Sequence, residues 1–511
     1  MTCREQRFAA GYAIRPRLIT LSILLCFLLC PFCASGGSTL TIGVGRDLYE
    51  GPESETYIHG STNVWEALTI LDGNLEPAGW LAESWRMQDG GRTWVFRLHR
   101  GVRFHNGSLL TAAHVVANME RRMKHRRFDP RGDLREVISV KAKGELNVVF
   151  RLKRPLPFFP ALMAYYGSPI FHPGVFDAKG RITRPVGTGP FRLGKVKPGE
   201  TIELFAFDGY RGKKPAFQRV MIRDIPDAQT RVFALIRGEI DAIIDVGGIL
   251  PSQINELKAG RDIELKRAQL AMTHYLMMNC RRPPFDNVGA RLWLAGRIDR
   301  KRLVDKLMEG TGIVAGEFYS PLARKWAPHD RALRSAPEAK KPAPLPKIPI
   351  VILLHSNFQQ RLPYDLIAQV IAQTLREEGF EPRIEIKETG AFQEALKKGE
   401  FHLSIQPRNL LTGDPDFYYS SNISSSSFRN TGFTDPEADR LIDLARHETG
   451  QQKRRRIYDR LASIMAANMP MIPLYHEVAL YAHRKDVEGL TMDAVFRPDL
   501  AAARPSGGSV R

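Results

Sequence analysis

Helices and strands alternate regularly between residues 350 and 405, and this alternation constrains the fold more than any other feature of the chain. Strand patterns occupy Ile350–Leu354, Arg383–Lys387 and Phe401–Ile405, and amphipathic helix patterns occupy Pro363–Glu378 and Phe392–Lys397. A strand, a helix and a second strand in succession form a βαβ unit, whose strands lie parallel in one sheet. The sequence therefore predicts an α/β fold for this part of the chain.

The rest of the chain carries further strand and helix signals. Thr39–Val44 and Thr93–Leu98 are predicted strands, and Asn63–Ile70 is a predicted short helix. Thr111 is a suitable N-cap for a helix that continues to about Met123. Because domains average about 150 residues, a chain of 511 residues corresponds to about three domains or one large two-lobed body.

The first 37 residues have the pattern of a cleavable export signal. An uncharged run from Leu18 to Phe32 is followed by small residues at 34–37, and it is shorter than the ~20 residues that a spanning helix needs. The run is preceded by four arginines, Arg4, Arg7, Arg15 and Arg17. We therefore expect residues 1–37 to be a signal peptide and the mature protein to be periplasmic.

Cysteine usage agrees with this interpretation. Of the five cysteines, only Cys280 lies beyond the signal, so the mature chain forms no internal disulfide. The residues before Cys30 and Cys33 do not form a clean lipobox, which disfavours a lipid anchor.

The formal net charge is +19 at pH 7, but the basic residues are scattered along the chain. The densest clusters, at 121–127 and 453–456, fall in helix patterns without interleaved aromatic residues, so a solvated basic surface is expected. Export also argues against a nucleic-acid partner.

No motif for catalysis or for a cofactor is evident. The metal-binding His-Glu-x-x-His, the Gly-x-Ser-x-Gly nucleophile turn and the phosphate-binding loop are all missing. The histidines are isolated in sequence, and Cys280 is expected to be packed and inert, although Arg281 and Arg282 beside it could acidify a thiol. The loop at 187–190, Gly-Thr-Gly-Pro, could present N–H groups to an anion, but it also suits a plain connection. We therefore expect no catalytic residue, metal or cofactor.

A long motif resembles the signature of the family 5 extracellular solute-binding proteins, the receptors of peptide and nickel ABC importers. It runs through residues 81–98, 101–107 and 110–112, and reads LAESW, DGGRTWVFRL, GVRFHNG and LTA. Three later stretches agree in order: 185–191, 279–286 with 298–300, and Asp414-Pro415-Asp416 with the ending at 469–475.

The resemblance implies an α/β protein with the two-lobed periplasmic binding protein fold (type II, similar to cluster C) and an extra subdomain in lobe one. Lobe one would comprise residues 38–265 plus 474–511, with the extra subdomain at about 64–184, and lobe two residues 266–473. The lobes would close over the ligand by a hinge motion. The protein would be a monomer that delivers its ligand to separate permease and ATPase subunits at the inner membrane.

The ligand is predicted less directly, because the chain departs from the family pattern. Peptide-binding relatives commonly carry an acidic residue before the Asp-Pro motif, where this chain has Pro407–Gly413 without a carboxylate. The aromatic residues that nickel-binding relatives carry there are replaced by Asn409 and Gly413. Arginine is a bidentate donor for a carboxylate. The candidate ligand-binding residues are Arg408, Asn409, Asp414, Tyr418 and Tyr475.

The leading functional prediction is a periplasmic receptor for di- or oligopeptides. The alternative within the family is a receptor for a nickel chelate or another small solute. A secreted hydrolase, and a sensor or chaperone that uses the same fold, are the alternatives from other classes.

Overall fold

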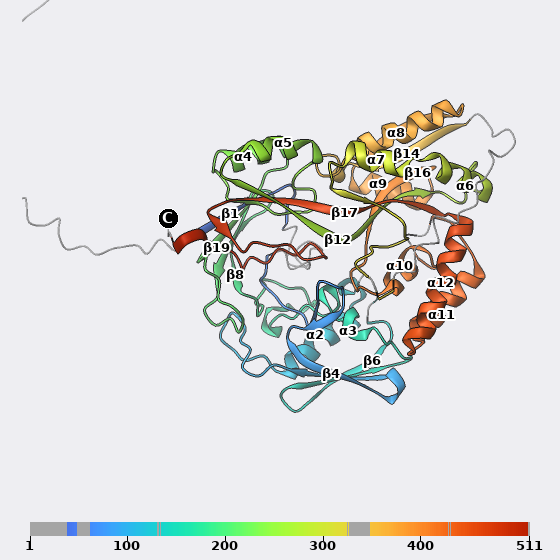
Figure 1. Ribbon diagram of the computed structural model, residues 1–511. Helices are drawn as coiled ribbons and strands as arrows, with labels where there is room; N and C mark the ends of the chain where they lie inside the picture. Colours follow the sequence, from blue (N-terminus) through green and yellow to red (C-terminus); the bar gives the residue numbers. More distant parts are fainter. Residues whose placement is uncertain are drawn as a thin grey trace, which may run out of the picture. The chain divides into compact units, whose positions relative to one another are not determined.

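The first strand that the structure describes, Thr39–Val44 (β1), lies inside a large mixed sheet (Figure 1). The computed structural model describes residues 38–48, 62–129, 132, 134–323, 325–326, 348–427, 429 and 431–508. Residues from Ser38 onward form one unit. The predicted signal peptide lies outside the described residues.

The large sheet has the strand order β15-β14-β16-β12-β17-β11-β1-β10-β9-β8, with β13 paired to β17. Its strands after β1 are β8 (Phe191–Lys197), β9 (Thr201–Ala206), β10 (Arg219–Asp224), β11 (Ala242–Ile243), β12 (Ile263–Met278), β13 (Gly312–Val314), β14 (Pro349–His355), β15 (Glu381–Lys387), β16 (Leu403–Asn409) and β17 (Met471–Arg484). The predicted βαβ passage is confirmed, because β14 pairs in parallel with both β15 and β16.

Two long antiparallel strands, β12 and β17, lie next to each other in the middle of the sheet. β17 pairs with β11 near its end at His483 and Ala482, and β12 pairs with β16 from Met272 onward. Their register shifts between Gln269 and Thr273. These strands therefore connect the half of the sheet that holds β1 with the half that holds β14.

A second, smaller sheet is separate from the first and has its own apolar core. Its order is β4-β5-β7-β6, with α2 and α3 beside it. The elements of this region are β2 (Thr69–Leu71), β3 (Pro77–Gly79), β4 (Ala82–Gln88), β5 (Thr93–Leu98), α2 (Ala112–Lys124), β6 (Val137–Lys143), β7 (Asn147–Leu152) and α3 (Phe159–Leu162). We call residues 68–170 the small-sheet unit.

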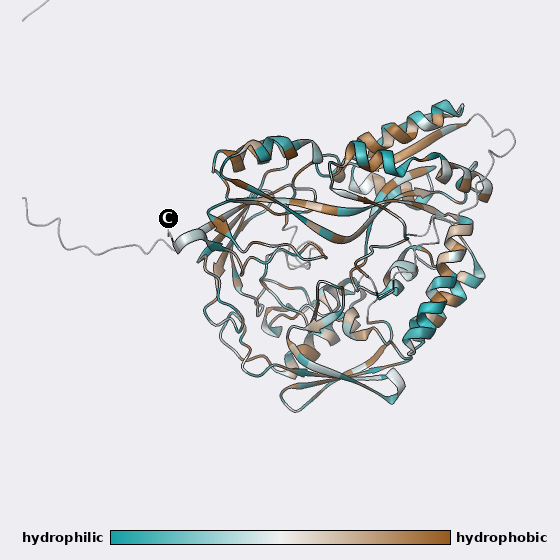
Figure 2. Ribbon diagram, in the orientation of Figure 1, coloured by the Kyte–Doolittle hydropathy of each residue, from teal (hydrophilic) through white to brown (hydrophobic). Residues whose placement is uncertain are grey.

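The remaining α-helices lie in the chain between successive strands of the large sheet. They are α4 (Ala228–Ile236), α5 (Ile254–Ala259), α6 (Val288–Arg297), α7 (Arg300–Leu307), α8 (Tyr364–Glu377), α9 (Thr389–Lys398), α10 (Pro415–Asn422), α11 (Pro436–His447) and α12 (Gln451–Asn468), and β18 (Val487–Glu488) pairs with β19 (Arg504–Pro505) near the end. Both α11 and α12 mix hydrophilic and hydrophobic residues along their length (Figure 2). The buried face of α11 is apolar, with Ala438, Leu441 and Ala445 turned inward.

The predicted helix at Asn63–Ile70 is wrong. Residues 64–68 are buried and non-helical, and their carbonyl groups accept hydrogen bonds from distant segments. The N–H of Gly189 donates to Val64 O at 3.0 Å, and the N–H of Trp80 donates to Leu68 O at 3.2 Å. Tertiary hydrogen bonds therefore replace the helical ones. A Cβ on Gly189 would lie 2.2 Å from Asn63 O, so the Gly-Thr-Gly-Pro loop needs its glycine for packing.

The helix that Thr111 caps is confirmed, at Ala112–Lys124. The N–H of Thr111 donates to His114 Nδ1 at 3.0 Å, as part of a capping box. Among the described residues, no helix is long and apolar enough to cross a bilayer.

Candidate ligand-binding site

A cavity of about 240 Å³ lies between the small-sheet unit and three segments that come much later in the chain. The small-sheet unit contributes Leu75, Glu76, Pro77, Trp85, Trp94, Pro157, Phe158, Pro160 and Ala161. The opposite wall consists of Lys325, Trp326, Thr412, Gly413, Asp414, Thr449, Gln451 and Arg454. Ligand pockets for drug-sized molecules are usually about 300–1,000 Å³. The cavity therefore suits a small ligand.

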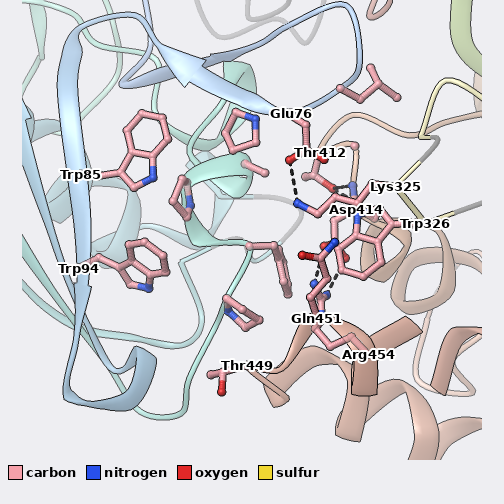
Figure 3. Close-up of a pocket in the computed structure, with 17 residues that line it drawn as sticks. Glu76, Trp85, Trp94, Lys325, Trp326, Thr412, Asp414, Thr449, Gln451 and Arg454 are labelled. Atoms are coloured by element: carbon pink, nitrogen blue, oxygen red, sulfur yellow. Dashed lines mark hydrogen bonds and ion pairs between the residues drawn. The ribbon is translucent and has the colours of Figure 1, made fainter. Parts of the chain in front are cut away.

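Aromatic rings form the wall on the small-sheet unit, where Trp85 and Trp94 lie across from Trp326 and Arg454 (Figure 3). Trp85 comes from β4 and Trp94 from the neighbouring β5. Trp94 is buried against Phe159, with ring centres 6.3 Å apart. Its indole Nε1 is buried and has no hydrogen-bond partner among the described residues.

A buried ion pair holds the opposite wall together. Arg454 donates to both carboxylate oxygens of Asp414 at 2.8 Å, and the hydroxyl of Tyr458 donates to the same carboxylate at 3.0 Å. Asp414 and Arg454 are 3% and 2% exposed. Burial alone would lower the pKa of Arg454, but the Asp414 carboxylate outweighs it and raises that pKa above its ordinary value. Arg454 is therefore charged at neutral pH.

Asp414 also begins the next helix. Its side chain accepts a hydrogen bond from the N–H of Asp416 at 3.0 Å, and Pro415 occupies the first turn of α10. This is the local arrangement that an Asp-Pro sequence favours at a helix start. The guanidinium of Arg454 lies 4.8 Å from the ring centre of Trp326 and 5.2 Å from that of Phe158, so it links both walls.

A second ion pair joins the two walls directly. Lys325 Nζ lies 2.9 Å from Glu76 Oε2, and the two side chains are 37% and 39% exposed. This is a solvent-exposed pair, of a kind worth about 0–1 kcal/mol.

Further contacts hold the same two parts of the molecule close together. Arg154 donates to Asp443 at 2.9 Å, and the ring of His447 is hydrogen-bonded to Pro155 O at 2.8 Å. At Gly413, where φ is 64°, a Cβ would lie 2.0 Å from Leu75 O. The backbone at Gly413 and the backbone at Leu75 therefore lie too close together for a side chain at position 413.

Of the five predicted site residues, only Asp414 lines this cavity. Arg408 lies on β16 and donates to Gln406 Oε1 at 2.9 Å and to Pro407 O at 3.0 Å. Burial, together with the nearby charge of Arg429, lowers the pKa of Arg408 to about 9. Among the residues that the structure describes, neither Nε of Arg408 nor Oδ1 of Asn409 has a hydrogen-bond partner, although both atoms are buried. Among the described residues, no carboxylate forms an ion pair with Arg408.

The two predicted tyrosines are buried. Tyr418 stacks on Tyr275 with ring centres 5.9 Å apart, and its hydroxyl donates to Met471 Sδ at 3.4 Å. Tyr475 stacks on His274 with ring centres 4.1 Å apart, and its hydroxyl has no partner among the described residues. Tyr418 and Tyr275, which stack on each other, both lie close enough to Arg408 to affect its pKa.

Burial raises the pKa of the Cys280 thiol, which argues against the acidified thiol that the neighbouring arginines could produce. The part of the chain that the structure describes holds no group of three or more potential His, Cys, Asp or Glu metal ligands.

Several residues that line the cavity are not among the site residues predicted from the sequence. Trp85 and Trp94 lie inside the family motif, and Lys325 and Trp326 have no sequence pattern that marks them. Arg454 belongs to the basic cluster at 453–456, for which a solvated surface was expected. That expectation is wrong for Arg454, because tertiary packing buries it beside Asp414.

The family profile described as bacterial extracellular solute-binding proteins, family 5 Middle, matches residues 76–430. The chain belongs to this family. Among its relatives is the probable D,D-dipeptide-binding periplasmic protein DdpA of Escherichia coli K12, which is 25% identical over 84% of both chains.

Two solved structures illustrate the range of ligands among proteins of similar fold. The dipeptide-binding protein from Pseudoalteromonas sp. SM9913, in complex with Met-Leu, has a TM-score of 0.79 and 20% identity, and the match covers 92% of this chain and 100% of that one. NikZ from Campylobacter jejuni, in complex with Ni(L-His), has a TM-score of 0.74 and 20% identity, with 90% and 99% covered. The similarity to these structures establishes the two-lobed α/β fold.

Proposed function

We propose that this protein is the periplasmic substrate-binding component of an ABC importer and that it captures small peptides between its lobes. The observation that carries the proposal is the cavity between two walls from distant parts of the chain, which are joined by the Glu76–Lys325 ion pair and by Arg454, whose guanidinium lies near aromatic rings of both walls. A cavity of this kind binds a ligand when its walls separate and close again. Membership of a solute-binding family supports the same conclusion.

In this proposal the two lobes of the protein have the boundaries predicted from the family resemblance. Lobe one comprises residues 38–265 and 474–511, with an extra subdomain at about 64–184, and lobe two comprises residues 266–473. The small sheet has its own apolar core, and β12 and β17 lie where the two halves of the large sheet meet. Both observations support this division. Opening would then occur by bending near the register shift of β12 and β17.

The peptide assignment rests on the chemistry of the cavity and on the printed ligands of relatives. Peptides carry apolar side chains together with charged ends, and the cavity offers tryptophan and phenylalanine rings together with both signs of charge. Arg408 is a second candidate group, since its guanidinium lacks a carboxylate partner among the described residues and suits an anionic ligand end. A monomer delivers the ligand to separate permease and ATPase subunits.

The test uses protein exported to a periplasm and purified without refolding. Native mass spectrometry, with the denatured mass as reference, should reveal a bound peptide. Saturation at a hundredfold excess over Kd should raise the free energy of unfolding by about 2.7 kcal/mol. A panel of dipeptides and tripeptides is compared with nickel plus histidine. Stabilisation by the nickel mixture alone would overturn the peptide assignment.

A further inference from the structure

The small sheet has one face that is packed and one face that is turned to solvent. Val148 and Phe150 of β7 belong to the same apolar core as Val115 and Met119 of α2. Figure 1 shows α2 and α3 on this inner side of the sheet. Because successive side chains of a strand point to opposite faces, the residues between those of the core lie on the other side. We call that side the outer face.

The outer face is rich in positive charge. The pairing registers of the four strands arrange it in three rows of four residues, with one residue from each strand. Five of these twelve residues are Lys or Arg, and none is Asp or Glu. In the strand order β4-β5-β7-β6, the rows are Ser84, Arg97, Asn147 and Lys143; Arg86, Val95, Val149 and Lys141; and Gln88, Thr93, Arg151 and Ser139.

The registers keep the five cations apart while holding them in one area. No two of them lie directly opposite each other on neighbouring strands: Arg86 lies opposite Val95, and Arg151 lies between Thr93 and Ser139. Like charges directly opposite each other would destabilise the sheet, and this arrangement avoids them. Neighbouring strands are ~4.8 Å apart and alternate residues of a strand are ~7 Å apart, so all five cations lie within an area of about 14 by 14 Å.

Most of this positive charge has no counter-ion on the protein. Arg97 Nε lies 3.1 Å from Glu83 Oε2, and both side chains are well exposed. Asp89, in the turn between β4 and β5, accepts a hydrogen bond from the hydroxyl of Thr93. Among the residues that the structure describes, the other four cations of the outer face form no ion pair, and all four are exposed. They can therefore bind an anionic partner outside the chain.

The chemistry of the outer face fits an anionic lipid surface better than a protein partner. The centres of stable protein interfaces are built on aromatic and apolar side chains and contain few lysines. The apolar residues of the outer face are Val95 and Val149, and Val95 is only 7% exposed. A sheet with cations spread over it matches a broad surface with spread negative charge. Anionic phospholipids give a bilayer such a surface.

We propose that the outer face of the small sheet is a docking surface for the anionic headgroups of a phospholipid bilayer. This inference goes beyond the proposed function and does not depend on which solute the protein binds. At 0.15 M salt, charges act over ~8 Å, so neighbouring cations of the face act on the same headgroups. Each Lys or Arg near an anionic surface strengthens binding by about fivefold. Docking of this kind keeps a receptor beside the membrane that holds its permease.

The experiment measures cosedimentation with vesicles, using protein exported to a periplasm and purified without refolding. One set of vesicles contains equal amounts of phosphatidylglycerol and phosphatidylcholine, and the other contains phosphatidylcholine alone. Binding is measured at ~0.1 M and at ~1 M salt. The test variant is R86Q/K141Q/R151Q, which removes three exposed cations of the outer face that have no ion-pair partner among the described residues.

The matched control is K258Q/K306Q/K397Q, which lowers the net charge by the same amount. These three lysines are exposed, lie on α5, α7 and α9, and form no ion pair within the part of the chain that the structure describes. Urea unfolding verifies that both variants are folded. Calorimetry with the dipeptide panel reads solute binding separately, and we expect both variants to match the wild type there.

We expect the wild type to bind the anionic vesicles and not the neutral ones, and ~1 M salt to abolish binding because the screening length falls to ~3 Å. The test variant should bind about a hundredfold more weakly, and the control within about threefold of the wild type. Equal weakening of the two variants would mean that net charge alone attracts the protein, and would overturn the inference. The inference is also wrong if the wild type does not bind the anionic vesicles, or if it binds soluble polyglutamate in their place, which would indicate an acidic protein partner.

Discussion

Removing Arg454 should destabilise the protein more than any other change at the cavity. Its guanidinium makes two 2.8 Å hydrogen bonds to Asp414 and donates to Ala445 O at 2.9 Å from Nε. In R454M the Asp414 carboxylate stays buried and keeps only Tyr458 and the helix N–H as partners. Loss of one partner of a buried ion pair costs about 3–5 kcal/mol.

The double variant R454M/D414N separates the charge from the packing. Asparagine also caps helices well, so it preserves the start of α10 without a buried negative charge. We therefore expect the double variant to be more stable than R454M alone, by about 2 kcal/mol or more.

Urea unfolding is followed by tryptophan fluorescence, because Trp326 lies 4.8 Å from the Arg454 guanidinium and reports on this wall. The single variants and the double variant together form a double-mutant cycle. If R454M lost less than about 1 kcal/mol, or if D414N did not rescue it, the ion pair would not hold the wall together.

Three further outcomes follow from the structure. G413A should weaken peptide binding by about tenfold or more in calorimetry, because its Cβ would lie 2.0 Å from Leu75 O on the opposite wall; unchanged affinity would mean that the walls need not meet there. Burial raises the pKa of Asp245, but the charges of Arg46 and Arg361 outweigh it and hold that pKa at about 2, below the ordinary 3.8. The resulting stabilisation is present above about pH 4 and is lost as pH falls toward 2, so R46M should lose up to about 2 kcal/mol at neutral pH and show a flatter acid-unfolding curve; an unchanged curve would contradict the linkage. Since burial raises the pKa of the half-buried Cys280 thiol, a thiol reagent near pH 7.5 should label it more slowly in the native protein than in the unfolded chain, and equal labelling rates would contradict this.

Local patterns in the sequence determined most of the individual elements. Period-2 and period-3.6 apolar spacing located β5 and α8, and Thr111 marked the start of α2, because these elements satisfy their own backbone groups or pair with near neighbours. The long family motif indicated the fold class, since its residues form β4 and β5 and contribute to the core of the small sheet. The helix predicted at 63–70 is wrong because the backbone of this segment is hydrogen-bonded to residues around 80 and 189.

The site depended on tertiary structure far more than the elements did. The sequence singled out Asp414, which caps α10 and lines the cavity, because an Asp-Pro helix start is a local signal. It gave no reason to join Glu76 with Lys325, or Arg454 with Asp414, since those partners are separated by 249 and 40 positions. Charge and burial are properties of the folded surroundings: the same arginine is a solvated cation on an outer helix face and a fixed structural ion beside a buried carboxylate. The sequence by itself determined what this chain folds into, and only the tertiary structure decided which of its charges line the cavity.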